Sequence, residues 1–344
     1  MLKKHPLHQD NPKLSALLLH LEQLLKPIQK EIEKNEKPKP ELPIICIVGT
    51  SRSGTTLLLQ TLASVDGLAY PSNFLTRFAY APYIGAILEQ LLFDAESDFH
   101  GDFSDLHDFF NLNKQMSKDP TLYSSDLGKT KGLLAPNEFQ HFFRHYLPKT
   151  VIECLTTQEL EQVNIDGMLR GLASIEMVKK KPFVTKATLI AQNILYFAKH
   201  LDTAIFLYIH REPADIMCSL LAARRRMFGN ETGWIGRHPP EYVWLKDENT
   251  YTQIAGQVFF IQQNIEKSLH DLPANRHLSI TYKQLCSNPL EIVKKVEEAC
   301  AAMGYISKFT YNGPANFQLS DKPKDPSELK SLLDAYENIR QRFS

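Results

Sequence analysis

The sequence has little of what marks secreted, metal-binding or membrane-spanning proteins. No run approaches the roughly 18 apolar residues that a membrane span requires. The cysteines are odd in number, scattered and never spaced C-x-x-C, which argues against a disulfide framework and a zinc ribbon; they are Cys46, Cys154, Cys218, Cys286 and Cys300. We therefore expect a cytoplasmic protein in a reducing compartment, with no membrane span.

Net charge is also absent. The 39 Lys and Arg residues balance the 39 Asp and Glu residues, giving a formal net charge of +0. No global field therefore draws the chain to nucleic acid or to an anionic membrane. With 43% hydrophobic and 23% charged residues, the composition is that of a globular protein. We expect no nucleic-acid partner, and any anion site must be built locally.

What the chain does contain is an alternation of strand and helix patterns. Short apolar runs predict four buried parallel strands, at residues 44–48, 183–186, 204–210 and 277–281. Helical patterns follow them, among them 55–64 and 289–303, and residues 327–343 form a plain amphipathic helix pattern. This alternation predicts an α/β fold with a parallel sheet and right-handed crossovers.

Two further segments flank or interrupt this pattern. Leucines at helical spacing, followed by the charged, proline-spaced stretch EIEKNEKPKPELP, make residues 1–41 an N-terminal helix and linker ahead of a domain over 42–344. Residues 74–180 carry little strand signal and much helix, including a capping box at Thr156 and Glu159. We expect this block to be a helical insertion over the sheet that forms the acceptor side of a site.

A glycine-containing loop follows the first strand directly and opens a helix. It reads Gly49-Thr50-Ser51-Arg52-Ser53-Gly54-Thr55-Thr56. In this context a G-x-x-x-x-G loop can wrap a phosphate with its backbone amides, the helix N-terminus and the threonine hydroxyls. A triphosphate would need Lys where Thr55 stands, and the cation here is Arg52. The pattern predicts a P-loop-type parallel sheet flanked by helices, although the loop can also be a plain turn.

A second candidate anion site follows the third strand. Arg211 ends the strand pattern, Pro213 suits a first helical turn, and Ser219 lies about two turns further on. Arg211 and Ser219 can thus flank one anion, although an Arg before a helix is often a solvated or capping residue.

Together these segments resemble the sulfotransferase family that uses 3'-phosphoadenosine 5'-phosphosulfate (PAPS). GTSRSGTTLL resembles that family's 5'-phosphosulfate loop, P-R-S-G-T-T-L-L, and HREPADIMCS resembles its 3'-phosphate motif, R-x-P-x-D-x-x-x-S. The later ITYKQLCSNP is similar to its Y-E-D-L-x-x-x-P segment. Order and spacing agree over about residues 42 to 310, most closely with the bacterial and tyrosylprotein-like branch, whose loop carries Arg.

The resemblance implies roles by position. Arg52, Ser53, Gly54, Thr55 and Thr56 would hold the 5'-phosphosulfate, while Arg211 and Ser219 would hold the 3'-phosphate. Lys186, which ends FVTK, matches a strand-terminal Lys near the transferring group. The implied reaction is sulfuryl transfer from PAPS to a hydroxyl or amine of a small or medium-sized acceptor, with no metal required. Neither the acceptor nor the oligomeric state follows from the sequence.

The general base departs from the tyrosylprotein pattern. The Glu that such members carry twenty-one residues after the loop Arg is Asn73 here, which cannot accept a proton. We favour Glu138, in a P-x-E-F segment similar to one in bacterial members, and place it just inside a helix. A Glu in a first helical turn is often only a capping residue. His141, one turn on, is the second choice.

Other side chains have plainer interpretations. His141 and His145 have the i, i+4 spacing of a metal pair, but no third ligand accompanies them, so we expect packing or solvent. We expect Arg224-Arg225-Arg226 to be a solvated helix end, with a share in binding the 3'-phosphate as the weaker alternative. The aromatic, proline-rich stretch around Trp234 and Tyr242 is expected to be core or lid packing, or to line an acceptor pocket.

Two other functions stay open. A P-loop kinase or nucleotide hydrolase is disfavoured by Thr55 and would require magnesium-dependent binding of ATP. A non-catalytic nucleotide-binding protein is compatible with Asn73 and with the N-terminal helix, and it would bind nucleotide without transferring a group.

Overall fold

The computed structural model describes residues 11–35, 38–94, 101–102, 104–106, 108, 123, 125–148, 154–320 and 325–343. The principal strands are β1 (Ile44–Val48), β3 (Phe183–Lys186), β4 (Ala204–His210) and β5 (His277–Thr281). The longer helices are α1 (Pro12–Asn35), α2 (Thr55–Ala63), α3 (Pro82–Phe93), α7 (Ile165–Lys179), α9 (Pro213–Phe228), α11 (Thr250–His270), α13 (Pro289–Ala302) and α14 (Pro326–Phe343). No helix in these ranges is long and apolar enough to cross a membrane.

The four principal strands form one parallel sheet in the order β3-β1-β4-β5, which confirms the predicted strands and their direction. β1 lies between β3 and β4, and the three strands end within a few residues of one another: Ile47 pairs with Lys186, the last residue of β3, and Val48 pairs with Tyr208, two residues before the end of β4. The residues that follow these three strands therefore meet at one edge of the sheet. A two-residue antiparallel pair, β2 (Val65–Asp66) with β6 (Thr310–Tyr311), was not predicted.

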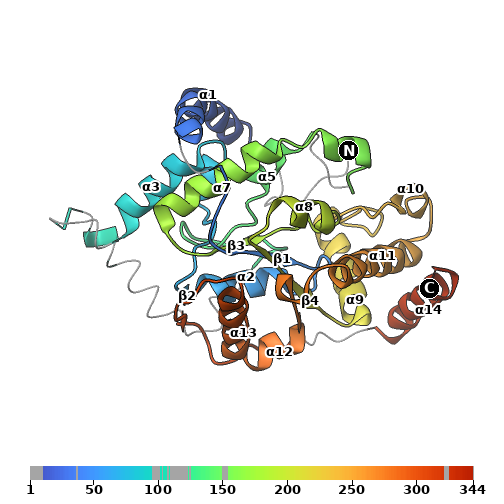
Figure 1. Cartoon of the computed structure of the whole chain (residues 1–344). Helices are drawn as coiled ribbons and strands as arrows, with labels where there is room; N and C mark the ends of the chain where they lie inside the picture. The colour runs from blue at the N-terminus through green and yellow to red at the C-terminus, as the bar shows by residue number, and fades with distance from the viewer. Residues whose placement is uncertain are drawn as a thin grey trace.

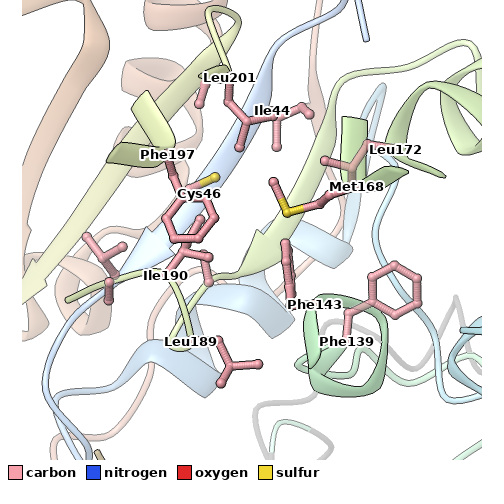
Figure 2. Packing of buried hydrophobic residues seen from close by; sticks show 14 of the residues in the cluster. Ile44, Cys46, Phe139, Phe143, Met168, Leu172, Leu189, Ile190, Phe197 and Leu201 are labelled. Carbon is pink, nitrogen blue, oxygen red and sulfur yellow. The ribbon is translucent and has the colours of Figure 1, made fainter. Parts of the chain in front are cut away.

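Both faces of the sheet are covered by helices, so the molecule has three layers (Figure 1). On one face, alternate strand residues such as Ile44 and Cys46 pack with Phe139, Met168 and other side chains from α7 and its neighbours (Figure 2). On the other face, the intervening residues pack against α2 and α13. Burial on both faces explains why β1, β3 and β4 are mainly apolar instead of alternating.

The N-terminal helix is longer than the sequence suggested. The charged stretch assigned to the linker continues α1 to Asn35, because Glu and Lys are good helix formers. The helix also lies on α7: Gln29 Nε2 donates to Ser174 Oγ at 3.3 Å, and Arg170 Nη1 donates to the Glu33 carbonyl at 2.8 Å. That last bond satisfies one of the carbonyls that a helix end leaves without a partner.

The described parts of residues 74–180 are mainly helical. They include α3, α5 (Gln140–Tyr146), α6 (Thr157–Glu161) and α7. The capping box predicted at Thr156 and Glu159 is present at the start of α6. The side chains of α5 and α7 complete the core on one face of the sheet. Through α5, this block reaches the strand ends where the candidate site lies.

The C-terminal end of α9 differs from the prediction for its three arginines. Arg225 and Arg226 form surface ion pairs, but Arg224 is 0% exposed. Its guanidinium lies 5.2 Å from the centre of the Trp234 ring and donates to Gln253 Oε1 at 2.8 Å. A buried guanidinium can be held in this way because stacking and hydrogen bonds replace part of its hydration. Arg224 is therefore part of the packing between α9 and α11 and is not solvated.

Candidate active site

The ends of three neighbouring strands deliver cations to one cleft of about 690 Å³. Arg52 follows β1, Lys186 ends β3 and Arg211 follows β4, and all three line the cleft. This is the edge at which open α/β sheets bind ligands. Among the described lining residues there are five cations and a single carboxylate, that of Glu138. The cleft is therefore suited to an anionic ligand, although the chain as a whole is neutral.

The loop between β1 and α2 has the geometry of a close turn. Gly54 has φ of 105°, and a Cβ there would lie 2.5 Å from the Tyr282 ring, so glycine is required on both counts. Arg52 also has a positive φ, 72°. This conformation strains the backbone of any residue other than glycine, and such strained residues cluster at functional sites. Thr55 and Thr56 line the cleft at the start of α2. Ser53, within the same loop, is fully buried, and its hydroxyl has no hydrogen-bond partner.

The two arginines of the predicted anion sites are linked to each other. Arg52 Nε donates to Ser219 Oγ at 3.1 Å, and Arg211 Nη1 donates to the Arg52 carbonyl at 3.2 Å. The Arg211 guanidinium lies 4.4 Å from the centre of the Tyr282 ring. Burial lowers the pKa of Arg52, and the neighbouring charge of Arg211 lowers it further. An anion bound between the two guanidiniums would relieve their repulsion.

A Lys-Glu pair occupies the other side of the loop. Lys186 Nζ contacts Glu138 Oε1 and donates to Thr56 Oγ1 at 3.2 Å. Glu138 Oε2 accepts a hydrogen bond from Gln140. Burial alone would raise the pKa of Glu138, but the charge and hydrogen bond of Lys186 and the hydrogen bond of Gln140 outweigh it, so the pKa lies below its ordinary value. Glu138 is therefore ionised at neutral pH and able to accept a proton.

Glu138 is not inside a helix, contrary to the sequence prediction. Helix α5 begins at Gln140, after Phe139 in a left-handed conformation (φ 57°), so Glu138 stands in the segment before it. Phe139 is fully buried against the sheet and stacks on Phe142, and this packing fixes the turn. Asn73 holds the same segment: its Nδ2 donates to the Gly132 carbonyl at 2.7 Å and its Oδ1 accepts from Asn137 at 2.7 Å.

The two histidines on α5 do not enter the cleft. His141 is exposed and is not among the residues that line it. The His145 ring packs against Tyr80, with 4.7 Å between ring centres, which agrees with the packing interpretation. Within the described ranges, no group of three or more His, Cys, Asp or Glu residues could hold a metal ion.

Sequence reasoning missed several residues of the cleft, above all Arg144 and Arg237. Arg144 follows Gln140 by four residues on α5, so both lie on one helix face, and this spacing could have indicated them. Arg237 lies in the proline-rich aromatic stretch, which the sequence left between lid packing and an acceptor pocket. Gln257 on α11 holds that stretch by donating to the carbonyls of Ile235 and Arg237 at 2.7 and 3.0 Å.

Comparison with known proteins gives one family and several similar folds. A model of the sulfotransferase family matches residues 43–302. The sulfotransferase STF1 from Mycobacterium tuberculosis H37Rv has a similar structure, with a TM-score of 0.52 and 12% identity over 94% of this chain and 81% of that chain. The sulfotransferase STF9 from Mycobacterium avium has a TM-score of 0.47 and 12% identity, over 95% of this chain and 78% of that chain. No curated protein matches significantly.

The family match and the geometry cover the same part of the molecule. Residues 43–302 run from the start of β1 to the end of α13 and contain Arg52, Lys186 and Arg211. The likeness to the Mycobacterium tuberculosis structure shows a shared fold. The chain belongs to the sulfotransferase family.

Proposed function

We propose that this protein transfers a sulfuryl group from PAPS to a hydroxyl or amine of a small or medium-sized acceptor. The observation that carries the proposal is the convergence of Arg52, Lys186 and Arg211 on one cleft, whose described lining contains one carboxylate, that of Glu138. Family membership supports sulfuryl transfer as the reaction. The choice of donor rests on the two anion motifs and on the positions of their side chains.

The residues present fit PAPS as the donor. Arg211 Nε is buried without a hydrogen bond and lies 3.8 Å from Asp215 Oδ2, so the chain itself satisfies this guanidinium only in part and a bound anion could complete its contacts. We assign the 3'-phosphate to Arg211 and Ser219, and the 5'-phosphosulfate to the loop residues Arg52, Thr55 and Thr56. Ser53 and Gly54 would shape this loop: Ser53 through its backbone and buried side chain, Gly54 through its positive φ.

Transfer requires an in-line displacement at sulfur. A bond forms between the acceptor oxygen or nitrogen and sulfur, the bond from sulfur to the phosphate oxygen breaks, and the acceptor proton passes to Glu138. Lys186 and Arg52 would stabilise the charge that develops on the leaving phosphate, because fixed cations in a partly buried site need no reorganisation. Because Lys186 contacts Glu138, we infer that Lys186 both holds the base in position and contacts the transferring group.

Calorimetric binding tests the donor directly. We expect 3'-phosphoadenosine 5'-phosphate (PAP), the product nucleotide, to bind the full chain, and ATP with magnesium to bind at least about tenfold more weakly because Thr55 replaces the lysine that a triphosphate needs. Preference for ATP with magnesium would assign the loop to a kinase or hydrolase. Binding of PAP without transfer to any of a broad set of acceptors would favour a non-catalytic role.

The fixed cations and the cysteines support two further parts of the proposal. Because Arg52, Lys186 and Arg211 already face the cleft, we propose that no metal is required, and turnover should survive EDTA.

All five cysteines are free thiols, which supports a cytoplasmic location, where thiols stay reduced.

A further inference from the structure

Glu138 stands in a segment without regular secondary structure, so contacts other than those of a helix must hold it in place. Helix α5 begins only at Gln140, and Phe139 between them has a left-handed backbone. The carboxylate nevertheless contacts Lys186 and accepts a hydrogen bond from Gln140. A base must lie within hydrogen-bond reach of the proton that it accepts, and a displacement of about 1 Å can lower a rate by about 10²-fold. The contacts that fix this segment therefore matter for catalysis.

Asn137 makes hydrogen bonds on both sides of Glu138. Its backbone amide donates to the Pro71 carbonyl at 2.7 Å, and its Oδ1 accepts from the Phe139 amide at 3.1 Å. A bond from a side-chain oxygen to the amide two residues further on forms an Asx-turn, which stabilises a bend in the chain. The Nδ2 atom of the same side chain donates to Asn73 Oδ1 at 2.7 Å. The orientation of the Asn137 side chain thus depends on Asn73.

Asn73 is itself oriented by bonds to the segment before Asn137. Its backbone amide donates to the Ala135 carbonyl at 2.9 Å, and its Nδ2 donates to the Gly132 carbonyl at 2.7 Å. A carbonyl oxygen can only accept a hydrogen bond, so it must meet the nitrogen of the Asn73 amide group. The oxygen of that group is then the atom presented to Asn137.

The residue before Asn73 anchors this part of the chain to two helices. Ser72 is buried, and its Oγ donates to Glu89 of α3. Glu89 Oε1 accepts in turn from Lys179 Nζ of α7, at 2.6 Å. Hydrogen bonds between charged groups are stronger than those between neutral groups. Asn73 therefore begins from a fixed position relative to α3 and α7.

We propose that Asn73 and Asn137 are positioning residues, which hold Glu138 against Lys186 in the place where it accepts the proton of the acceptor. This inference rests on the proposed function. Neither asparagine is among the residues that line the cleft, so we assign them no contact with donor or acceptor. Asn73 cannot accept a proton as a glutamate can, but its amide orients the neighbour of the residue that does.

Titration of Glu138 by NMR tests the position of its carboxylate without any acceptor. The full chain carries isotopically labelled glutamate, and the signal of Glu138 is the one that Glu138→Gln removes. In the wild type, Lys186 and Gln140 hold the pKa of Glu138 below its ordinary value, and the charge of Arg237 lowers it further. Asn73→Ala should let the carboxylate move away from Lys186, so its titration midpoint should rise by about 0.5 or more toward the ordinary value.

Kinetics with PAPS and 4-nitrophenol separate positioning from binding. Asn73→Ala should lower kcat about tenfold or more, while the affinity for PAP, measured by calorimetry, should stay within about twofold of the wild type. Asn137→Ser removes the same contact from the other side, because a serine hydroxyl can accept from the Phe139 amide but is too short to reach Asn73. The double variant should lose no more activity than the weaker of the two single variants, since both lack one shared bond.

Asn249→Ala is the matched control. The Asn249 side chain caps α11 by accepting from the amides of Tyr251 and Thr252, and it does not line the cleft. This variant should melt at a lower temperature and keep both kcat and the titration midpoint of Glu138. A loss of stability alone therefore cannot imitate the expected result.

Two outcomes overturn the inference. One is an unchanged midpoint of Glu138 in both Asn73→Ala and Asn137→Ser. The other is a higher KM for 4-nitrophenol with an unchanged kcat, which would mean that Asn73 contacts the acceptor. If PAP does not bind the wild type, the proposed function fails at that step, and the NMR midpoints alone decide whether the two asparagines hold Glu138 against Lys186. The midpoints decide in the same way if the wild type does not transfer to 4-nitrophenol.

Discussion

At the scale of single residues, Arg52 makes two hydrogen bonds: its carbonyl accepts one from Arg211, and its guanidinium donates one to Ser219. Arg52→Ala keeps the carbonyl and the positive φ, which is equally strained for alanine, so the fold should be retained. Loss of the charge should lower turnover by about 10²-fold or more, as for other fixed groups that stabilise a developing charge. Steady-state kinetics with PAPS and a thermal melt measure the two effects.

A matched variant isolates the charge of Arg52 from its hydrogen bond. Ser219→Ala removes the partner of Nε together with one proposed contact to the 3'-phosphate, but it leaves the cation, so kcat at saturating PAPS should fall much less than in Arg52→Ala. If Arg52→Ala turned over as fast as the wild type, the loop would not have the assigned chemistry.

Glu138 is predicted to act as the base, and Glu138→Gln should lower kcat by about 10² to 10⁴-fold. PAP should bind the variant equally well or more tightly, because a carboxylate that competes for Lys186 is removed. In the wild type the pKa of Glu138 lies below its ordinary value, since Lys186 and Gln140 outweigh burial, so loss of activity through this group should begin only at acidic pH. A pH profile of kcat/KM from pH 4 to 8 measures it. Unchanged turnover in the variant would move the base to another group or to the substrate itself.

Gly128 lies next to the side chains of Glu138 and Thr56. A Cβ at this position would lie 3.7 Å from both Glu138 Oε1 and Thr56 Oγ1. Gly128→Val should therefore fill the space in front of the base and lower kcat/KM for the acceptor by about tenfold or more. Gly132→Val is the matched control: Gly132 also has a positive φ, but its Cβ would meet Ala135 outside the cleft. Equal losses in the two variants would attribute the effect to backbone strain alone.

At the scale of elements, the sheet was predictable and the turns were not. β1, β3 and β4 are short, mainly apolar runs buried on both faces, and each is followed at once by a loop, so the sequence indicates their bounds. β5 is only partly buried and was found from its place before a helix. The pair β2 and β6 has two residues in each strand and leaves no periodic pattern. The start of α5 depends on the burial of Phe139, a tertiary contact, and for this reason Glu138 was placed in the wrong element.

The gathering of three cations in one cleft could be predicted for the same reason as the sheet. Arg52 and Arg211 follow strands and Lys186 ends one, and parallel strands bring their carboxyl ends together. The rest of the cleft lining could not be predicted, because Arg144 and Arg237 come from segments that meet only after the chain has packed. Arg224 shows the same limit: a run of three arginines indicates solvent until Trp234 and Gln253 are placed beside it.

The capping box between β5 and α12 (Tyr282–Ser287) lies behind the loop that follows β1. Thr281 Oγ1 accepts from the Gln284 amide at 3.1 Å, and Tyr282, the next residue, lies against Gly54 and beneath Arg211. Thr281→Ala should lower the free energy of unfolding by about 1 kcal/mol, while Thr281→Ser should keep most of it. Urea denaturation measures both variants. Equal stability of Ala and Ser at this position would mean that the cap contributes nothing.

At the scale of the whole molecule, charge is distributed unevenly. The formal net charge is +0, but the described lining of one cleft holds five cations and one carboxylate. A neutral chain attracts no anion over long distances, so recognition depends on short-range contacts inside the cleft. The three-layer fold makes this possible, because helices on both faces bury the strands and leave their carboxyl ends facing the cleft.

Added salt should therefore weaken PAP binding because it screens the cations that line the cleft. Screening of the molecule's net charge should contribute nothing, since that charge is zero. Raising the salt concentration from about 0.05 to 0.5 M should weaken binding several-fold, because partly exposed cations such as Arg211 are screened. Arg211→Gln should bind PAP more weakly and lose less affinity with added salt than the wild type does. Arg340→Gln changes the net charge by the same amount at an exposed site on α14 and should keep the wild-type dependence. Calorimetric titrations at several salt concentrations measure the PAP affinity of all three proteins. If the salt dependence of that affinity changed equally in Arg211→Gln and Arg340→Gln, the net charge of the molecule would govern binding.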